Sequence, residues 1–401
     1  MKLETQSIRD ISNSIIQGVD NSIIPRNCVN FALNMQFDKV IGRAVLREGS
    51  ALVGSQIVNN KSCLGLFMYT KSDDTKILLS VFNDANDTNS DIYKYASSWS
   101  KTKEDLTQGE KVRFVQFLDA VTAVNGTDNP VTFDGTDWTD TTIHDTANFP
   151  VGKYVIEWHS RIYCAGVNNN EDTLYYSSIP VAGNISWTSG NGFIIIEPFE
   201  REGMITGLAK VPGYLLVFKE RALKRWDGNT TYPDDLCRLG TPSQESIVLG
   251  KSTVYYFSAG YKNSVGIYET SGVETRLISR PIQEIIEAIP SANYADVAGF
   301  SDGSTIRFSV GDITWDGITY SNVEIYYHIS TKTWTVFSYP TKHTVYSLYL
   351  SGTDIKAVCG DSDGQVLELD VGNTDETTIT PSPSESPSES PSESPSASPA
   401  P

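Results

Sequence analysis

Short runs of β-branched and aromatic residues alternate with clusters of Gly, Asn, Asp and Ser from about residue 40 to residue 372. The runs include KILLSVF, GYLLVFKE, STVYYFSAG, STIRFSV and VEIYYHI. Each has the length of a strand, and the clusters between them are rich in residues that favour turns. The pattern therefore predicts an all-β fold with many tight turns.

One segment has helical periodicity instead. In SRPIQEIIEAIPSAN, residues 279–293, four isoleucines fall at positions i, i+3, i+4 and i+7, namely Ile282, Ile285, Ile286 and Ile289. Pro281 suits the first turn of a helix that begins there. We expect a single short helix inserted in the β chain.

The strand pattern also recurs. A unit of an apolar or aromatic strand, a short polar turn and a Trp or second strand repeats at anchors spaced by 40, 42, 49, 44, 58 and 40 residues. The anchors are Tyr93, Phe133, Tyr175, Lys224, Tyr268, Tyr326 and Val366. A period in the forties is typical of β-propeller blades. Two stacked β-sandwiches would also give short strands and turns, but the regular spacing favours a β-propeller of six to seven blades.

Tryptophans occupy similar places in several of these units. Trp99, Trp187 and Trp334 each follow a polar turn. A large aromatic side chain there would fill space between neighbouring sheets that one four-stranded sheet cannot bury by itself. This arrangement also favours the propeller.

Composition divides the chain into three parts. Residues 1–39 are expected to form an N-terminal arm, residues 40–373 the β-propeller domain, and residues 374–401 a Ser/Pro-rich C-terminal tail with a PSES repeat. The tail has no large apolar side chain after Ile379, so we expect it to be disordered. The start has no signal-peptide core and no run is long enough to cross a bilayer, which predicts a protein made in the cytosol without a membrane anchor.

The net negative charge of the chain limits which macromolecules it can bind. The formal net charge is −18, from 49 acidic and 31 basic residues, and the short basic cluster around Lys224 and Arg225 does not compensate for it. A groove that grips nucleic acid needs a positive footprint, so tight DNA or RNA binding is not expected. A conduit that must not hold DNA would tolerate the charge. The 5 cysteines are odd in number and widely separated, which predicts buried free thiols.

Acidic turns are the candidates for a metal site. DSDG at residues 361–364 begins like a calcium loop, but the acid expected at the twelfth position is missing, because residue 372 is Gly. A β-turn explains this motif better, as it does the Asp-Gly pairs at Asp302 and Asp316. The chain has no phosphate-binding loop and no dinucleotide fingerprint. We therefore expect no metal and no cofactor.

The segment TFDGTDW is similar to the turn motif of sialidase propellers, although its Asp and Gly are adjacent and not one residue apart. It contains Asp134, Gly135, Asp137 and Trp138. That turn is structural in sialidases, which also need an arginine cluster and a Tyr/Glu nucleophile pair. No motif assembles the available arginines, such as Arg161, Arg221 and Arg307. We expect Asp134 and Gly135 to turn the chain, Asp137 to face solvent and Trp138 to pack between blades.

Nucleophilic triads have no better support. The histidines are His144, His159, His328 and His343, and none accompanies a G-x-S-x-G elbow or a protease-type Cys. We expect each of them to be a surface or half-buried strand residue. The prediction is that the protein is not an enzyme and has no catalytic residues.

Residues 8–54 are similar to the opening of a family of bacteriophage virion proteins. In that family an I-P segment leads to an A-L-N stretch and then to R-x-G followed by a further G. The matching pieces here are Ile24-Pro25, Ala32-Leu33-Asn34, Arg47-Glu48-Gly49 and Gly54. Further units resemble the family in the same order: DNPVTFDGTDW, WHSRIYCAG, LYYSSIPVAGNISW, ISRPIQEIIEAI and GDSDGQVLELD.

The family resembled is the propeller-type tail nozzle, or tubular tail protein, of short-tailed phages. The resemblance implies a homohexameric ring below the connector, in contact with a portal or adaptor ring and other tail proteins, through which DNA leaves the capsid. Nozzle proteins are often much longer and carry domains for fibre attachment, whereas here the Ser/Pro tail follows the ring. The arm is expected either to reach a neighbouring subunit or to close the propeller as an added strand.

The leading interpretation is a non-enzymatic virion protein, located in the phage tail and made in the host cytoplasm. A second interpretation is a propeller that binds, or even cleaves, a surface glycan as a receptor-recognition module. A third is a cellular propeller that serves as a platform for protein interactions.

Overall fold

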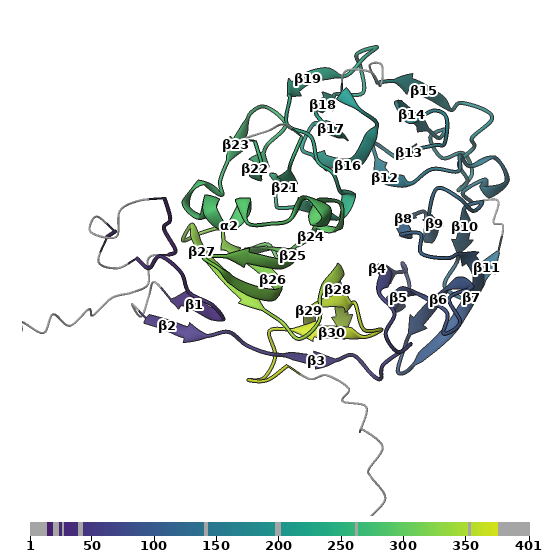
Figure 1. Cartoon of the computed structure of the whole chain (residues 1–401). Coiled ribbons are helices and arrows are strands. Elements are labelled where there is room, and N and C mark those ends of the chain that lie inside the picture. Colours follow the sequence, from purple (N-terminus) through teal and green to yellow (C-terminus); the bar gives the residue numbers. More distant parts are fainter. Residues whose placement is uncertain are drawn as a thin grey trace, which may run out of the picture.

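In the computed structural model, residues 14–18, 24–25, 28–38, 43–139, 143–196, 202–260, 264–351 and 354–375 are described. The tail expected at residues 374–401 lies outside these ranges except for Thr374 and Asp375. Within them the strands form seven four-stranded antiparallel sheets, arranged around a common axis as the blades of a β-propeller (Figure 1). The predicted all-β propeller is confirmed, and the number of blades is seven.

The first four blades follow one another along the chain. Blade 1 contains β4 (Cys63–Thr70), β5 (Lys76–Asn83), β6 (Asn89–Tyr95) and β7 (Trp99–Thr107). Blade 2 contains β8 (Arg113–Phe117), β9 (Ala120–Val124), β10 (Val131–Phe133) and β11 (Trp138–Thr139). Blade 3 contains β12 (Tyr154–Trp158), β13 (Arg161–Ala165), β14 (Thr173–Tyr176) and β15 (Gly192–Ile195). Blade 4 contains β16 (Ile205–Val211), β17 (Tyr214–Lys219), β18 (Leu223–Trp226) and β19 (Asp234–Cys237).

Three more blades complete the ring. Blade 5 contains β20 (Ile247–Leu249), β21 (Val254–Ser258), β22 (Gly266–Thr270) and β23 (Thr275–Leu277). Blade 6 contains β24 (Ala298–Ser301), β25 (Thr305–Trp315), β26 (Ile318–His328) and β27 (Thr333–Ser338). Blade 7 contains β28 (His343–Ser351), β29 (Asp354–Asp361), β30 (Val366–Leu369) and, from the other end of the chain, β3 (Ser50–Leu52). The first strands of neighbouring blades pack together and form the inner ring.

The seven repeat anchors found in the sequence all fall on the third strand of a blade. They lie on β6, β10, β14, β18, β22, β26 and β30. Trp99 and Trp138 open the fourth strand of their blades, and Trp334 is the second residue of the fourth strand of its own. The repeat is regular because each unit must bury the same sheet faces against its two neighbours.

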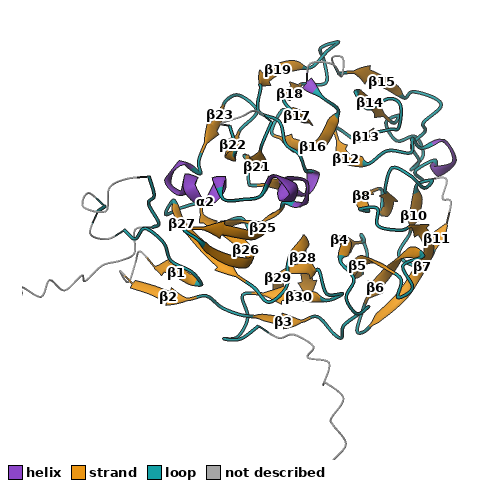
Figure 2. Cartoon of the chain, viewed as in Figure 1, coloured by secondary structure: helices purple, strands orange, loops and turns teal. Residues whose placement is uncertain are grey.

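The long step before Tyr326 reflects an insertion between blades 5 and 6. It consists of η3 (Arg280–Ile282), α2 (Gln283–Glu287) and η4 (Ser291–Asp296), with Pro281 in the first turn (Figure 2). The four isoleucines predicted to share a helix face are at most 2% exposed. They pack in the core that joins blades 5 and 6. Two further single turns, η1 (Thr146–Asn148) and η2 (Gln244–Ser246), precede blades 3 and 5.

Ring closure uses a strand that precedes blade 1. β3 pairs antiparallel with β30, so that Ser50 lies opposite Leu369 and Leu52 opposite Leu367. Figure 1 shows this purple strand beside the yellow strands of blade 7. Because one blade is built from both ends of the chain, the ring cannot open without breaking that blade. The closing strand therefore lies after the predicted arm, inside the segment assigned to the propeller.

Arg47, just before β3, ties three segments together. Its guanidinium forms an ion pair with Asp375 (Nη2–Oδ2, 2.5 Å) and donates to the carbonyl of Ser338 at 3.1 Å. Nε donates to the side-chain oxygen of Asn34 at 3.1 Å, and the guanidinium carbon lies 4.1 Å from the centre of the Tyr339 ring. We call these five residues the clasp.

Two residues after Arg47, the backbone of Gly49 passes close to the backbone of Thr374. A Cβ on Gly49 would lie 2.1 Å from the carbonyl oxygen of Thr374, so only glycine fits where the two ends of the chain cross. The R-x-G motif thus supplies both the charged residue of the clasp and the space for closure.

The arm packs on blade 6 of its own chain. Ile15 is fully buried in the core of blades 5 and 6, and the hydroxyl of Ser14 accepts from the backbone N–H of Trp334 at 2.8 Å. Phe31 lies 4.8 Å from the Trp315 ring. The arm then forms a hairpin of β1 (Met35–Asp38) and β2 (Arg43–Leu46), with β1 against β27. This hairpin spans the boundary predicted at residue 39.

Replacing Arg47 by Ala should lower the free energy of unfolding by about 3 kcal/mol, because the change leaves the Asp375 carboxylate, which is 15% exposed, without its partner. Denaturant unfolding followed by tryptophan fluorescence measures this. Arg276→Ala removes a pair whose Arg side chain is 60% exposed and should cost less than about 0.5 kcal/mol. Equal losses for the two variants would contradict a special role for the clasp.

Candidate functional site

The segment TFDGTDW forms the turn between β10 and β11. The Asp134 carboxylate accepts hydrogen bonds from the backbone N–H groups of Thr136 (2.8 Å) and Asp137 (3.1 Å), and Gly135 has a φ of +101°. These hydrogen bonds lower the pKa of Asp134. A glycosidase general acid needs the opposite shift, since it must be protonated before it donates. Asp134 therefore has a turn-forming role, as predicted.

The rest of this segment also agrees with its predicted roles. Asp137 is exposed, whereas Trp138 is half-buried and stacks on Phe133 with 5.0 Å between ring centres. Phe133 belongs to the core cluster that joins blades 1 and 2, and Trp138 packs against the same cluster. The segment is a structural repeat and brings no second acid to a reaction centre.

The acidic turns considered for calcium are closed by backbone hydrogen bonds. Asp361 is fully buried and accepts from the N–H groups of Asp363 and Gln365 at 3.0 and 2.8 Å. Asp302 accepts from Ser304 and Thr305 in the β24–β25 hairpin. In the described ranges no group of His, Cys, Asp or Glu residues is arranged to hold a metal ion. The turn interpretation is thus confirmed for these two motifs.

Two histidines differ from the expectation that all four would be surface or half-buried. His144 is fully buried: its Nε2 donates to the carbonyl of Phe117 at 2.8 Å, and its Nδ1 accepts from the Thr122 hydroxyl at 2.6 Å. Burial lowers the pKa of His144 to about 4, so the ring is neutral at pH 7. His343 is 2% exposed and contacts Glu324. Both rings satisfy buried polar groups, a role that single residues in a sequence do not reveal.

The three arginines considered for carboxylate binding lie on different blades. Arg161 donates to the carbonyls of Ser177 and Gly190 on blade 3, and Arg221 is exposed in the turn between β17 and β18. Arg307 is fully buried on blade 6, paired with Asp370. The described structure therefore does not bring these arginines together as a carboxylate-binding cluster.

The Arg307 pair belongs to a charged cluster buried between blades 6 and 7. Glu324, 1% exposed, lies 3.7 Å from Arg307, accepts from the Tyr346 hydroxyl at 2.7 Å and contacts His343 at 3.0 Å. Burial raises the pKa of Glu324, but His343 and Arg307 outweigh this and lower it. The carboxylate is therefore ionised and binds blade 6 to the closing blade.

The space around the propeller axis is narrow and crossed by another ion pair. Arg113 on β8 pairs with Glu245 on η2 at 2.7 Å, and Lys111 lies 3.5 Å from the same carboxylate. Burial raises the pKa of Glu245, but Arg113 and Lys111 outweigh this and lower it to about 2. The remaining cavity there has a volume of only about 250 Å³. Nucleic acid cannot pass through a single propeller by this route.

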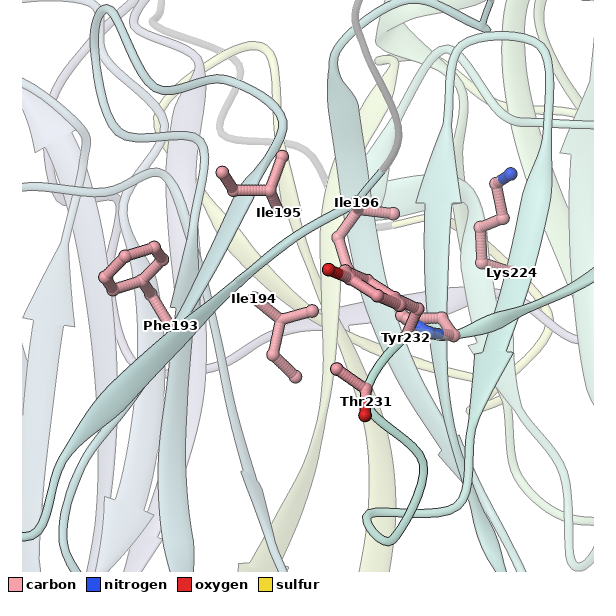
Figure 3. Close-up of a pocket in the computed structure, with 8 residues that line it drawn as sticks. Phe193, Ile194, Ile195, Ile196, Lys224, Thr231 and Tyr232 are labelled. Atoms are coloured by element: carbon pink, nitrogen blue, oxygen red, sulfur yellow. The ribbon is translucent and has the colours of Figure 1, made fainter.

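An apolar groove of about 660 Å³ lies on the outer rim between blades 3 and 4. Figure 3 shows Ile194 of β15 and Ile196 just after it pointing towards Tyr232, while Phe193 and Ile195 point to the other side of the chain. Tyr232 is 67% exposed, Phe193 61% and Ile195 52%. These side chains make an uncharged outer edge, which we call the β15 edge (residues 193–196 with Tyr232).

Sequence patterns did not identify the β15 edge, the clasp or the channel ion pair. The edge had a detectable signal, since the unbroken run FIII, residues 193–196, occupies the position where blade 1 has KTKED and blade 4 has DDL. It becomes visible only after the blades are aligned. The two ion pairs join residues more than a hundred positions apart, which no local pattern reports.

Comparison with known proteins identifies the fold alone. No family model matches the chain, and no curated protein is similar enough to match it. A crystal structure of the extracellular domain of BT4673 from B. thetaiotaomicron is 11% identical, with a TM-score of 0.50, over 80% of this chain and 39% of that one. YCF48 bound to a D1 peptide is 10% identical with a TM-score of 0.45, over 82% of this chain and 98% of that one. This chain thus spans about two fifths of the BT4673 structure.

No helix among the described residues is long and apolar enough to cross a membrane.

Replacing Trp138 by Ala should lower the free energy of unfolding by about 2 kcal/mol, because a half-buried aromatic contact with Phe133 is lost. Asp137→Ala is the control in the same turn: it removes an exposed side chain and should cost less than about 0.5 kcal/mol. Denaturant unfolding compares the two. A hydrolase activity that Asp134→Asn abolished without unfolding the protein would overturn the structural interpretation of the segment.

Stability should fall as the pH decreases from about 6.5 to 4, because His144 takes up a proton more readily in the unfolded chain than in the folded one. A pKa shift from 6.5 to about 4 corresponds to about 3 kcal/mol over this window. His144→Gln should flatten the dependence of the unfolding free energy on pH in this window. His159→Gln, at an exposed position, should leave the slope unchanged; an unchanged slope in His144→Gln would contradict the assignment.

Proposed function

We propose that this chain is a structural virion protein, a subunit of a homohexameric ring in the tail or head-to-tail region of a short-tailed phage. Genomic DNA would leave the capsid through the ring, which would contact a portal or adaptor ring and other tail proteins. The protein catalyses no reaction in this role. Its place is the virion tail.

The observation that carries the proposal is the meeting of two motif pieces in the clasp. Asn34 comes from the A-L-N piece and Arg47 from the R-x-G piece, and the two side chains are hydrogen-bonded at 3.1 Å. Gly49 of the same piece is the residue that permits ring closure. The resemblance in the N-terminal region therefore rests on residues that act together in closing a propeller. This favours a shared architecture over a chance match of short motifs.

Charge and channel geometry fit a conduit made of several copies. A net charge of −18 per chain repels phosphates, so DNA would slide without being held. Because ion pairs cross the axis of each propeller, the passage for DNA must lie between copies. A ring of propellers satisfies this requirement.

A second candidate, recognition of a surface glycan, is favoured by the rim groove. Its volume of about 660 Å³ is within the range of ligand sites, and Tyr232 offers an aromatic face. Cleavage has less support, because the acids and arginines considered for it do not converge. A Tyr232→Ala variant that lost binding on a glycan array would favour this candidate.

Purified protein should form six-membered rings, visible by negative-stain electron microscopy and as a hexamer by mass photometry. The rings should not retain duplex DNA in a mobility-shift assay at about 50 mM salt, where electrostatic binding is strong. Particles that stay monomeric at every concentration and bind glycans would overturn the proposal in favour of the second candidate. Tight DNA binding would contradict the conduit role.

A further inference from the structure

The outer strands of the blades differ in how their edges are protected. β7 carries Lys101, Lys103 and Glu104, and β19 carries two aspartates. Charged residues of this kind prevent edge-to-edge pairing. β27 is covered by the arm of its own chain, where the N–H of Asn34 donates to the carbonyl of Val336 at 2.8 Å. β15 itself carries no charged residue, and no described strand pairs with its outer side, although Lys224 lines the adjoining groove.

The free backbone groups of β15 can be assigned from its pairing. The N–H of Ile196 donates to the backbone carbonyl of Asp172 on the β14 side at 2.8 Å, and the antiparallel register places Ile194 opposite Leu174. Hydrogen-bonded pairs alternate with non-bonded pairs in such a ladder. The N–H and C=O groups of Phe193 and Ile195 therefore face outward.

β2 of the arm hairpin also has backbone N–H and C=O groups that face outward. The N–H of Arg47 donates to the carbonyl of Asn34 at 3.0 Å, and Met35 lies opposite Leu46. By the same alternation, the backbone groups of Ala44 and Leu46 face away from β1. Leu46 is 78% exposed, and no described strand pairs with the outer side of β2. This is a second short edge, with an exposed apolar side chain at its end.

The two edges lie on nearly opposite sides of the molecule. β2 extends blade 6 and β15 ends blade 3, three blades away in a ring of seven (Figure 1). With a charge of −18, two copies repel each other over most of their surface. Contact between copies is least opposed where neither surface is acidic: β15 (GFII) has no charged residue, and β2 (RAVL) has no acidic residue.

We propose that β15 of one copy pairs with β2 of the next copy and joins the arm-extended blade 6 of one chain to blade 3 of its neighbour. Each edge presents two residues with outward backbone groups, so two pairs of hydrogen bonds can form. Phe193 and Ile195 on one side and Leu46 on the other bury apolar area beside them. Such a contact is heterologous and generates a closed ring when the rotation between copies closes. This inference rests on the proposed ring and names its subunit contact.

The test uses the full chain, and in each variant lysine substitutions block one of the two edges. Phe193→Lys/Ile195→Lys blocks β15, and Leu46→Lys blocks β2. Val273→Lys is the matched control, since Val273 is 66% exposed on blade 5, away from both edges. Circular dichroism confirms folding, and mass photometry measures assembly. Each blocked variant should need a concentration about tenfold or more above wild type for half-assembly, whereas the control should assemble as wild type does.

A mixture of the two blocked variants gives the sharpest result. Each retains one intact edge, so the mixture should form one-to-one dimers and stop there. If Leu46→Lys by itself assembled as well as the wild-type protein does, the inference would be overturned. Rings that still formed with the β15 substitutions would overturn it too. Neither result would contradict the proposed ring function. The wild-type protein could instead form open head-to-tail filaments that these substitutions prevent. That result would support the contact and overturn the ring. A wild-type protein that never assembles overturns both.

Discussion

Closure of blade 7 by β3 is the constraint on which the rest of the structure depends. A row of blades buries each sheet only against its neighbours, and the two end blades expose one face unless the row closes. Here residues 50–52 complete a sheet whose other strands lie some three hundred residues later. The clasp at Arg47 and the contact at Gly49 stabilise this junction, and they also position the arm, because Asn34 accepts from both Arg47 and the backbone of Ser338. Ring closure and arm docking are therefore one structural event.

The interior of the ring is occupied by charges that serve the fold. Glu324 and Arg307 connect blade 6 to blade 7, and Glu245 connects Arg113 and Lys111 across the axis. Each of these carboxylates keeps its charge because cationic neighbours outweigh the effect of burial. Buried pairs of this kind add little net stability, but removing one partner is costly, so they specify which blades meet. The consequence for function is that the outer rim, and not the axis, is available for interactions.

Sequence reasoning recovered what is local and periodic. The seven anchors mark the third strands because every blade faces the same packing problem. The four isoleucines mark a buried helical segment, although α2 itself holds only Ile285 and Ile286, while Ile282 lies in η3 and Ile289 after α2. Asp134 and Asp302 mark turns by bonding to the backbone just after them. It failed where the determinant is distant. The closing strand is three residues long, and two partners of Arg47, Ser338 and Asp375, lie 291 and 328 positions away. The burial of His144 depends on Thr122 and Phe117 from neighbouring strands. The β15 edge was missed because an apolar run usually means a buried strand.

The arm packs on its own propeller and, in the proposed ring, also contacts the next copy; both roles follow from its geometry. Its first part is integrated in the core, since Ile15 is fully buried and Gln17 accepts from the N–H of Ile285 at 3.2 Å. Its last part forms a hairpin whose outer strand ends in the exposed Leu46. A segment that only sealed blade 6 would need no second strand, because β1 already lies against β27. The second strand adds an exposed leucine and open backbone groups, which is a liability in an isolated protein and an advantage in one that assembles. The acidic surface then restricts pairing to the edges that carry no acidic residue and favours ordered assembly over aggregation.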